Sequence, residues 1–527
     1  MAVTIPFLDT LRSFFSDRGG KPATASADDT VGTIKTVPFP ELVAAWRARC
    51  EMFPFQAGSA TGRRSAVLVT PWLGTPVPFY NLEVARALAA AGEQVEVIFD
   101  GHDVFGNAPI AAENRALEDT LALLPSWLRI NRVDQTAPIE PDAEDHELAG
   151  QIIAENAVWR TRGESTASEF IDRKRDVVVR LGEHVARVRR LIAARGIEWL
   201  LIPGGIWGLS RAYVSAARKA GIHFATYDTG AGMMVFSQDG VASHQSDLPR
   251  ALAMTLAEIS PGGRARMIGW ARHELQERMQ GRGNYFKFQS TPATGTATDG
   301  PNVFVPLNLR WDSAALGRER LFPSVKEWVT AIVRWAASEP AARVCFRQHP
   351  AERFKAFRTS DDIGALIREI NTAGDRVRFV AASDPVNSYD LLGSVRVLLP
   401  FTSSMGAEAP ILGIPVVTSA QNYYDSFEFI NCADSPEHYF ALASRAVRGE
   451  LNVTESQRDL AALVYCLVQH CNFMPTGFTA APTDFVEWVK VPPGELWPRE
   501  DLVDLRRALL TGEPLAYIRQ RRFVAEA

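Results

Sequence analysis

The stretch that decides the fold is VRVLLPFTSSMGAEAPILGIPVVT, residues Val395–Thr418. It begins with a short, mostly apolar run at 395–399, which is typical of a buried parallel strand. Hydroxyl residues and a glycine follow where that strand should end, and Ala407–Leu412 then has the pattern of the first turns of a helix. Gly413 ends this helix, and 414–417 begins a second strand. The stretch therefore predicts a strand–turn–helix–strand unit of an α/β protein.

The turn in this unit has the composition of a phosphate site. Backbone N–H groups, the helix dipole and the hydroxyls of Thr402, Ser403 and Ser404 converge at the start of the helix, and phosphate is the usual ligand of such a place. The alternative is an ordinary unit in which a serine only caps the helix. The spacing of the residues favours neither interpretation.

Length and composition limit the class of protein. The chain has 527 residues, 46% of them hydrophobic and 22% charged, which indicates a globular protein of several domains. The net charge of −5 excludes a broad nucleic-acid surface. The five cysteines lack metal-ligand spacing, and no run approaches 18 apolar residues. We therefore expect a cytoplasmic protein. The amphipathic segment 5–15 would allow weak contact with a membrane, and a docking arm or a disordered tail explains it equally well.

Changes in composition divide the chain. Residues 19–35 and 290–302 are rich in Gly, Ala, Ser, Thr and Pro, which is typical of linkers. The prediction is an N-terminal arm at 1–60, an α/β domain with a helical insertion at 61–290, a second α/β domain at 300–440, and a helical segment at 441–527 that packs back on the domains.

The first predicted domain alternates strands and helices. Its strands are expected at 65–69, 94–99, 198–203 and 222–227, with a largely helical region at 108–195. No GxGxxG follows the first strand, so this half gives no dinucleotide signal. Asp228 ends the last of these strands beside a glycine-rich loop, which is where an open α/β sheet places its chemistry.

The second predicted domain has strands at 303–307, 343–347 and 377–380, with short helices between them, including one at 385–392. Gln348-His349-Pro350 stands at the end of its second strand. Pro350 restricts the backbone of His349, and an imidazole here can donate to a phosphate or protonate a leaving phosphate oxygen. Arg347 and Arg353 flank it. The alternative is a histidine with only a structural role.

Together, Gln348-His349-Pro350 and Thr402–Ala409, followed by Gly413-Ile414-Pro415-Val416, resemble the C-terminal half of GT-B-fold glycosyltransferases. The chain is most similar to capsular-polysaccharide biosynthesis proteins, and beyond them to Kdo transferases and bacterial sialyltransferases of GT-B fold. These proteins carry an HP motif and a serine motif that bind the nucleotide of the donor. The resemblance implies two Rossmann-like parallel-sheet domains facing a cleft. It covers 300–430 by motif and 65–290 only by its pattern of strands and helices.

The resemblance also implies roles for individual residues. His349 would contact the donor phosphate and assist its departure, Ser403 and Ser404 would hold that phosphate, and Glu408 would hold the ribose. A capping carboxylate is the alternative for Glu408. The rest of the expected donor site is Arg347, Thr402 and Gly406.

An acidic residue in a D/E-D-G motif of the first domain would act as the base toward the acceptor. Gln238-Asp239-Gly240 and Phe99-Asp100-Gly101 match that motif incompletely. We rank Asp228 first, Asp239 second and Asp100 third. No DxD metal motif occurs, so the resemblance implies a metal-independent transfer with no cofactor and a nucleotide sugar as co-substrate.

The expected function is transfer of a sugar from a nucleotide-sugar donor to a surface polysaccharide or glycolipid, in contact with the inner membrane or with capsule assembly proteins. Three alternatives remain. A non-hydrolysing nucleotide-sugar epimerase shares the fold but needs acid/base residues that the sequence does not identify. A polyol-phosphate transferase of teichoic-acid type needs a second histidine beside His349. A non-catalytic GT-B-like scaffold would explain the incomplete D/E-D-G match.

Overall fold

The structure is a computed structural model that describes residues 37–56, 61–72, 74–105, 108–172, 175–230, 233–282, 300–475, 478 and 482–525. The segment predicted to be amphipathic at 5–15, the linker predicted at 19–35 and most of the linker predicted at 290–302 lie outside the described residues. None of the helices described is long and apolar enough to cross a membrane.

The chain forms two units, and each unit is made of three separate segments. Unit 1 comprises residues 1–156, 172–247 and 471–519, and unit 2 comprises residues 157–171, 248–470 and 520–527. The division along the middle of the chain therefore falls at 247/248. The sequence placed it at 290–302, where the composition changes. Residues 248–282 belong to unit 2 because helix α10 (Pro261–Met279) packs on helix α15 (Glu455–Cys466).

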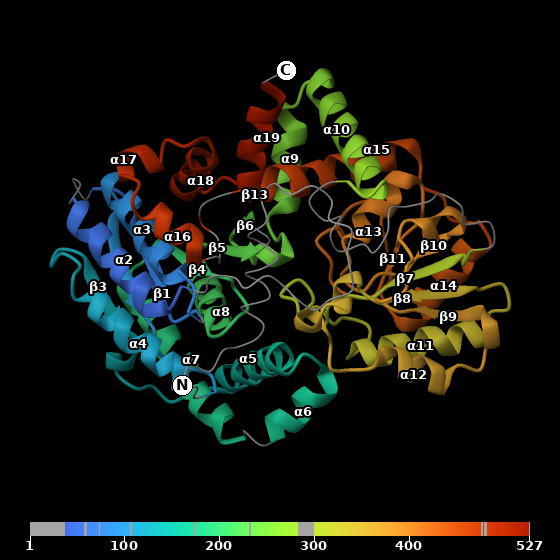
Figure 1. Ribbon diagram of the computed structural model, residues 1–527, viewed down its shortest axis with the longest axis horizontal. Coiled ribbons are helices and arrows are strands. Elements are labelled where there is room, and N and C mark those ends of the chain that lie inside the picture. Colours follow the sequence, from blue (N-terminus) through green and yellow to red (C-terminus); the bar gives the residue numbers. More distant parts are fainter. Residues whose placement is uncertain are drawn as a thin grey trace. The chain divides into compact units, whose positions relative to one another are not determined.

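Unit 1 is built on a seven-stranded sheet in the order β13-β6-β5-β4-β1-β2-β3 (Figure 1). The five strands from β5 to β3 pair in parallel, whereas β6 pairs antiparallel with β5 and β13 pairs antiparallel with β6. The strands are β1 (Arg64–Val69), β2 (Gln94–Phe99), β3 (Arg129–Arg132), β4 (Trp199–Pro203), β5 (His223–Gly230), β6 (Met233–Gln238) and β13 (Met474–Pro475).

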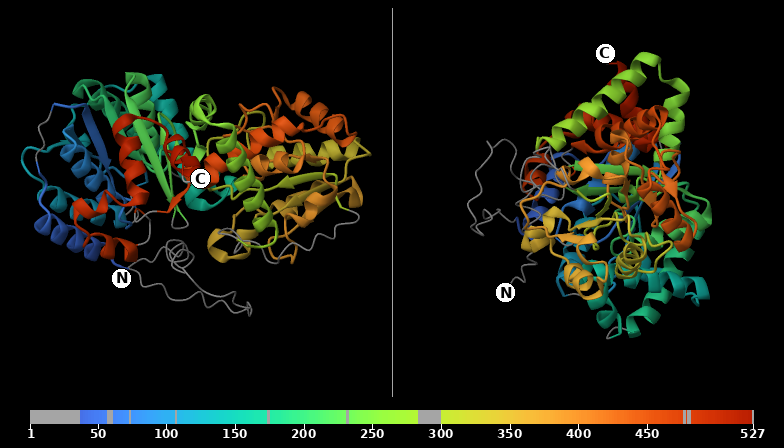
Figure 2. Two further views of the ribbon diagram at one scale, coloured as in Figure 1. Left: turned by 90° about the horizontal axis from the view of Figure 1, so that it is seen from above. Right: turned by 90° about the vertical axis from the view of Figure 1, so that its right-hand side faces the viewer.

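Helices surround this sheet, and their apolar faces account for its core (Figure 2). Val77–Ala90, for example, buries nearly every residue between the sheet and the C-terminal helices. The helices of unit 1, of which α5 and α19 each run on into unit 2, are α2 (Phe39–Met52), α3 (Val77–Ala90), α4 (Ala108–Leu121), α5 (Ala143–Thr161), α7 (Arg175–Arg195), α8 (Ser210–Ala220), α16 (Pro482–Trp488), α17 (Pro493–Leu496), α18 (Glu500–Thr511) and α19 (Leu515–Ala525).

Two features of unit 1 differ from the sequence prediction. The region 108–195 was expected to be largely helical, but it contains the strand β3, whose sequence RINR is too polar to be recognised as a strand. The strand predicted to end at Tyr227 continues to Gly230 and pairs with β6, so Asp228 lies within a strand and opposite Val235.

Unit 2 contains a four-stranded parallel sheet in the order β10-β7-β8-β9. An isolated bridge between Leu398 and Val416 adds the chain leading into β11 beyond β10. Named by their order along the chain, the strands of unit 2 therefore follow the sequence 3-2-1-4-5, as do the five parallel strands of unit 1. The strands are β7 (Val303–Pro306), β8 (Val344–Arg347), β9 (Val377–Val380), β10 (Val397–Leu398), β11 (Val417–Thr418) and β12 (Asn431–Cys432).

The helices of unit 2 include α11 and α12, which connect successive parallel strands of its sheet. Helices α11 and α12 pack together on one side of the strands, as Figure 1 shows. The predicted helix at 385–392 is instead a 3-10 helix at Asp390–Ser394. The helices are α6 (Glu164–Asp172), α9 (Leu248–Glu258), α10 (Pro261–Met279), α11 (Val325–Ser338), α12 (Ile363–Ile370), α13 (Met405–Glu408), α14 (Pro436–Val447) and α15 (Glu455–Cys466).

Candidate donor site and acid–base groups

The strand order of unit 2 creates a switch point between β7 and β10, where successive connections leave in opposite directions. Ligands of open α/β sheets bind outside the carboxyl ends of the strands at such a point. Asn308 follows β7 and Thr402 follows β10, and the Asn308 Oδ1 accepts the Thr402 N–H at 3.0 Å. The predicted Thr/Ser turn therefore lies at the switch point of its own unit.

The turn after β10 is fixed by its neighbours. The Ser403 Oγ accepts the Met405 N–H at 3.3 Å, and the Tyr424 hydroxyl donates to the Ser403 carbonyl at 2.8 Å. Gly406 lies against this tyrosine, where a Cβ would be 2.2 Å from the hydroxyl oxygen. The Ser403 side chain is half-buried and that of Ser404 is exposed. Both serine hydroxyls thus lie where a ligand can reach them.

The helix after the turn is shorter than the sequence suggested. Helix α13 has four residues and continues as a 3-10 helix at Ala409–Leu412. Pro410 provides no N–H for α-helical hydrogen bonding, and Gly413 ends the segment with a left-handed φ of 84°. The start of this segment, with its two serines, is the predicted anion site.

His349 lies two residues beyond strand β8, which pairs with β7 on the side away from β10. Its Nδ1 accepts the Ala351 N–H at 3.2 Å, so the proton of the neutral ring lies on Nε2. Burial, and then the charge of Arg347, lower the pKa of His349 to about 4. At pH 7 the ring is therefore neutral, and Nε2–H is a hydrogen-bond donor.

Arg347 is only 2% exposed. Its guanidinium donates to the carbonyls of Ala381 and Val386, the latter at 2.9 Å. Arg347, which was predicted to belong to the donor site, therefore stabilises the loop that follows β9.

Glu408 is buried in a polar network that the sequence did not reveal. Its carboxylate accepts from the Tyr389 hydroxyl at 3.0 Å and from Arg278 at 3.3 Å, and the Ser404 hydroxyl donates to it at 3.4 Å. Arg278 also donates to Gln469 at 2.7 Å. Glu408 therefore links the serine turn to α10, and its predicted contact with a ribose remains a prediction.

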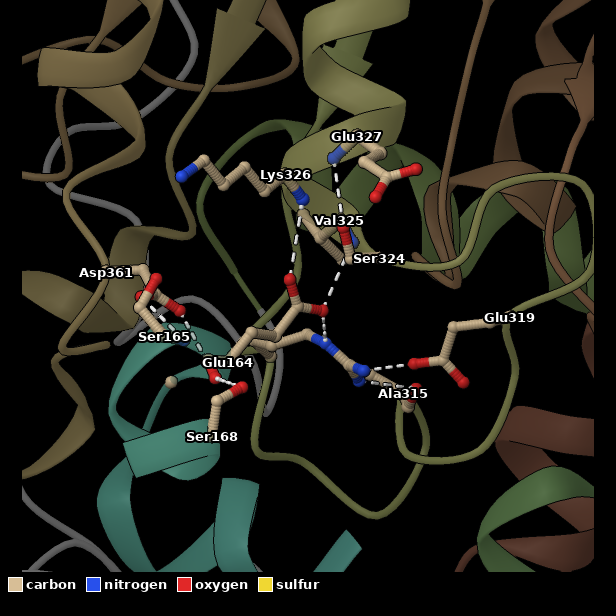
Figure 3. Close-up of polar contacts among 12 residues, drawn as sticks. Glu164, Ser165, Ser168, Ala315, Glu319, Ser324, Val325, Lys326, Glu327 and Asp361 are labelled. Carbon is tan, nitrogen blue, oxygen red and sulfur yellow. Dashed lines mark hydrogen bonds and ion pairs between the residues drawn. The ribbon is translucent and has the colours of Figure 1, made fainter. Parts of the chain in front are cut away.

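The start of α11, the helix that follows β7, offers no second anion site, because the carboxylate of Glu164 occupies it (Figure 3). Glu164 of α6 accepts the N–H groups of Val325 and Lys326, at 3.1 and 3.4 Å, and pairs with Arg310. In Rossmann-like units this helix start often holds a phosphate. In unit 2, the turn after β10 is therefore the candidate for a phosphate site.

A small pocket adjoins these groups at the carboxyl ends of β7 and β8. Asn308 and Gln348, which line it, are chain neighbours of the strand ends, and Asn308 also contacts the serine turn. The remaining lining residues are Glu164, Leu307, Arg310, Val325, Glu352, Thr359, Asp361 and Ile363. The pocket belongs to the same face of unit 2 as His349.

The three carboxylates proposed as bases occupy different places in unit 1. Asp228 is half-buried in the hairpin β5–β6 and accepts the Thr229 N–H at 2.9 Å. Asp239 has a left-handed φ of 53° and accepts the Phe224 N–H at 3.0 Å, so it lies at the amino end of β5. The parallel sheet places chemistry at the carboxyl ends of its strands, where Asp228 lies and Asp239 does not.

Asp100, the third candidate, follows β2 and is 1% exposed. Its Oδ2 lies 2.9 Å from the His184 Nε2 and accepts from the Tyr213 hydroxyl at 2.7 Å, while its Oδ1 accepts the His102 N–H at 3.0 Å. Sequence reasoning missed His184 and Tyr213 because they lie on helices α7 and α8, far along the chain.

Glu113 of α4 is a further titratable group near the carboxyl end of β1. Its carboxylate accepts hydrogen bonds from the backbone of Gly74 and Trp72, yet burial raises the pKa of Glu113 to about 7. One of its oxygens, Oε2, is buried with no hydrogen-bond partner among the described residues.

Over the described parts of the chain, no group of three or more His, Cys, Asp or Glu side chains is placed to hold a metal ion.

Two Rossmann-like units, one of them with an HP motif and a serine turn at its switch point, are the arrangement expected of the GT-B fold. Residues 259–428 match the family described as "Capsule polysaccharide biosynthesis protein", and this segment contains His349, the serine turn and Glu408. The matched segment spans 170 of the 527 residues and lies entirely within unit 2.

Solved structures resemble the chain only distantly. The β-Kdo 2,4-transferase of Thermosulfurimonas dismutans KpsC is 14% identical, with a TM-score of 0.33 over 51% of this chain and 80% of that one. The β-Kdo 2,7-transferase of the same protein is 15% identical, with a TM-score of 0.31 over 57% and 89%. The UDP-GlcNAc 2-epimerase of Neisseria meningitidis is 10% identical, with a TM-score of 0.22 over 76% and 95%. No curated protein matches the sequence.

Proposed function

We propose that the protein transfers a sugar from a nucleotide-sugar donor to a growing capsular polysaccharide, exopolysaccharide or glycolipid, without a metal ion. The observation that supports this proposal is the switch point of unit 2, where the turn with Ser403 and Ser404 meets Asn308 beside the strand that ends at His349. This site lies within the segment that matches the capsule family.

In this proposal the donor phosphate binds the hydroxyls of Ser403 and Ser404. Neutral His349 donates its Nε2–H to a phosphate oxygen. These donors stabilise the charge that develops when the bond between the sugar and the phosphate breaks, and such stabilisation is worth several kcal/mol in an enzyme site. Arg347, two residues before His349, anchors the end of β8 to the loop after β9.

Glu408 is proposed to contact the ribose of the donor. Its carboxylate is already bound by Arg278 and Tyr389, and these bonds orient it beside Ser404. The two oxygens of a carboxyl group have lone pairs for further hydrogen bonds, so a ribose hydroxyl can donate to Glu408. Asp228 of unit 1, a half-buried carboxylate at the carboxyl end of its sheet, is proposed as the base toward the acceptor. We place the reaction in the cytoplasm, with the acceptor at the inner membrane.

The first test is a thermal-shift screen of the full chain against CMP, UDP, GDP and CDP. A nucleotide that binds only the folded protein raises its melting temperature by mass action, so one of the four should give a concentration-dependent shift that identifies the donor class. Absence of a shift with every nucleotide would contradict the proposal.

The second test uses His349→Asn, with His273→Asn as the matched control, because His273 is an exposed histidine of the same unit. Sugar transfer from the donor identified by the screen should fall by about 100-fold or more in the first variant and remain unchanged in the second. Normal transfer by His349→Asn would refute the role of His349. Conversion of UDP-N-acetylglucosamine without any acceptor would instead indicate an epimerase.

A further inference from the structure

Arginines are concentrated in two segments of unit 2. Residues 248–272 and 520–525 contain six arginines and one acidic residue, Glu258, although the whole chain has a net charge of −5. The six are Arg250, Arg264, Arg266, Arg272, Arg521 and Arg522. In an acidic protein, so uneven a distribution gives one part of the surface a positive potential that attracts anions.

The two segments meet in the fold, because the end of α19 lies beside the start of α10 (Figure 1). A Cβ added to Gly263 would lie 3.3 Å from the Cβ of Val524. The Arg521 Nε lies 3.7 Å from the Glu258 Oε2 of α9. The arginines of both segments therefore lie on neighbouring parts of one surface.

These arginines differ in how far the fold already uses their charge. Arg272 is paired with Glu455 and Asp459 of α15, at 2.6 and 2.9 Å, so it adds little to the positive potential. Arg264 is exposed, and Arg266 is half-buried. The positive potential is therefore centred on the start of α10 and the end of α19.

Two aromatic rings lie among these arginines and reach the surface. Trp270 and Phe523 are half-buried, and their ring centroids are 6.4 Å apart. The Arg266 guanidinium carbon lies 4.7 Å from the centroid of the Phe523 ring. Met267 and Ala271, in the neighbouring row of α10, are buried on the side that packs on α15. The row with Arg266 and Trp270 is thus left to α19 and to solvent.

Arginines beside partly exposed tryptophan and phenylalanine are the combination that helices use where they rest on a lipid surface. The arginines bind anionic headgroups, and the rings lie at the level of the headgroups, between the apolar and the aqueous phase. A soluble polyphosphate would use the arginines alone, so the rings favour a membrane. The basic–aromatic patch comprises Arg264, Arg266, Trp270, Arg521, Arg522 and Phe523.

We propose that the basic–aromatic patch binds the surface of an anionic membrane. This goes beyond the proposed function, which assigns no part of the chain to the lipid. Helix α10 also carries Arg278, which pairs with Glu408 of the proposed donor site at 3.3 Å. Arg266 and Arg278 are twelve residues apart on this helix, which is about 18 Å along its axis. Binding of the patch therefore holds the serine turn of unit 2 at a short, fixed distance from the membrane.

The test is sedimentation of the full chain with phosphatidylcholine vesicles that contain or lack phosphatidylglycerol. We expect binding to the anionic vesicles alone, and weaker binding as the salt concentration rises, because salt screens exposed charges. The variant Arg266→Glu/Arg522→Glu should bind these vesicles about tenfold more weakly or less. Failure of the original protein to bind anionic vesicles would overturn the proposal, as would equal binding by this variant.

Arg334→Glu/Arg368→Glu is the matched control, because both arginines are exposed on α11 and α12 of the same unit and the net charge changes equally. This variant should bind vesicles as the original protein does. An equal loss in both variants would indicate general electrostatic attraction and overturn the role of the patch. Binding through the N-terminal segment 5–15 would leave the patch variant unchanged and would overturn it too.

The rings separate a membrane from a soluble polyanion. Trp270→Ala/Phe523→Ala should lower the affinity for anionic vesicles several-fold and leave any binding of polyphosphate, the soluble probe, unchanged. Polyphosphate binding by the original protein, together with undiminished vesicle binding by this variant, would make the patch a site for soluble polyanions and the proposal wrong.

Thermal unfolding with the nucleotide found by the screen shows that each variant is folded, and the nucleotide-induced shift should be the same in all of them. Absence of this shift from the original protein would count against the proposed function alone. Absence of vesicle binding, with the shift intact, would count against this inference alone.

Discussion

At the scale of single residues, half-buried His349 and buried Glu113 have pKa values that move in opposite directions. Burial and the charge of Arg347 lower the pKa of His349 to about 4, whereas burial raises that of Glu113 to about 7. In both cases the fold favours the neutral form. Neutral histidine is the form present at higher pH and neutral glutamate the form present at lower pH, so the two residues give stability opposite dependences on pH.

For His349, the contribution to the free energy of unfolding is fully present above pH 6.5. It is lost as the pH falls toward 4, because the unfolded chain takes up the proton first. His349→Asn should therefore reduce the loss of stability between pH 7 and pH 4 by about 1–3 kcal/mol. Urea denaturation at several pH values measures this. His273→Asn, at an exposed site, should keep the original slope, and an unchanged slope in His349→Asn would contradict the prediction.

For Glu113, the contribution is fully present below pH 4.5 and is lost as the pH rises through about 7, because the folded state holds the proton longer. Glu113→Gln should therefore be more stable than the original protein at pH 8, by up to about 3 kcal/mol, and similar to it at pH 4.5. Thermal unfolding at both pH values tests this. Asp119→Asn, on the exposed face of the same helix, should show no such crossover.

At the scale of elements, the turn after β10 depends on the space left by Gly406. A Cβ there would lie 2.2 Å from the Tyr424 hydroxyl, which itself holds the Ser403 carbonyl. Gly406→Ala should displace the buried tyrosine and the turn. The nucleotide concentration that gives the same thermal shift should therefore rise at least tenfold. Gly269→Ala, which meets open space in α10, should leave that shift intact. Equal nucleotide binding by both variants would rule out a donor site at this turn.

Helix α6 is held on unit 2 mainly by charge. Asp361 accepts the N–H groups of Glu164 and Ser165, at 2.5 and 3.2 Å, and Glu164 in turn caps α11. Ala167 is the buried residue that α6 contributes. Because so little apolar surface is buried, the docking of α6 should depend on these two carboxylates.

Glu164→Gln should accordingly raise amide hydrogen exchange in residues 163–172 about tenfold, since it weakens the hydrogen bonds to α11 and leaves Arg310 with one carboxylate fewer. Exchange is read by mass spectrometry of peptides from this segment. Glu169→Gln, exposed on the same helix, is the control and should exchange as the unaltered protein does. Identical exchange in both variants would show that packing holds α6.

The elements that the sequence predicted well have strong local signals. The strands at 65–69 and 94–99 are apolar runs bounded by loops, and both were confirmed to within a residue. Strand β3 is polar and β6 follows a glycine-rich loop, so neither was recognised. The serine turn was predicted because its residues are adjacent. The pairs Arg278–Glu408 and His184–Asp100 are 130 and 84 residues apart, and only tertiary packing brings them together.

At the scale of the whole molecule, the segments of the two units alternate along the chain. Unit 2 takes 157–171, 248–470 and 520–527, so its continuous middle part lacks two of its pieces when isolated. A fragment cut at the predicted linker would lose even more, because α10 would be absent, the face of α15 would be uncovered and Glu408 would lose Arg278.

We therefore expect fragment 300–470 to aggregate or to lack a cooperative unfolding transition, and fragment 248–470 to be the more soluble of the two. A buried carboxylate without its cationic partner costs several kcal/mol, and exposed apolar surface promotes association. Size-exclusion chromatography and near-UV circular dichroism compare them. A monomeric fragment 300–470 that unfolds cooperatively would contradict this expectation.

Because the segments of the two units alternate along the chain, they limit where relatives can recombine and still fold. In a glycosyltransferase whose nucleotide-binding unit is one continuous block, a single crossover can exchange donor specificity. Here a crossover in the linker would join the α10 of one parent to the α15 and Glu408 of the other, and α6 would remain with the wrong partner. Chimaeras of this protein should therefore retain function only when residues 157–171, 248–470 and 520–527 are transferred together.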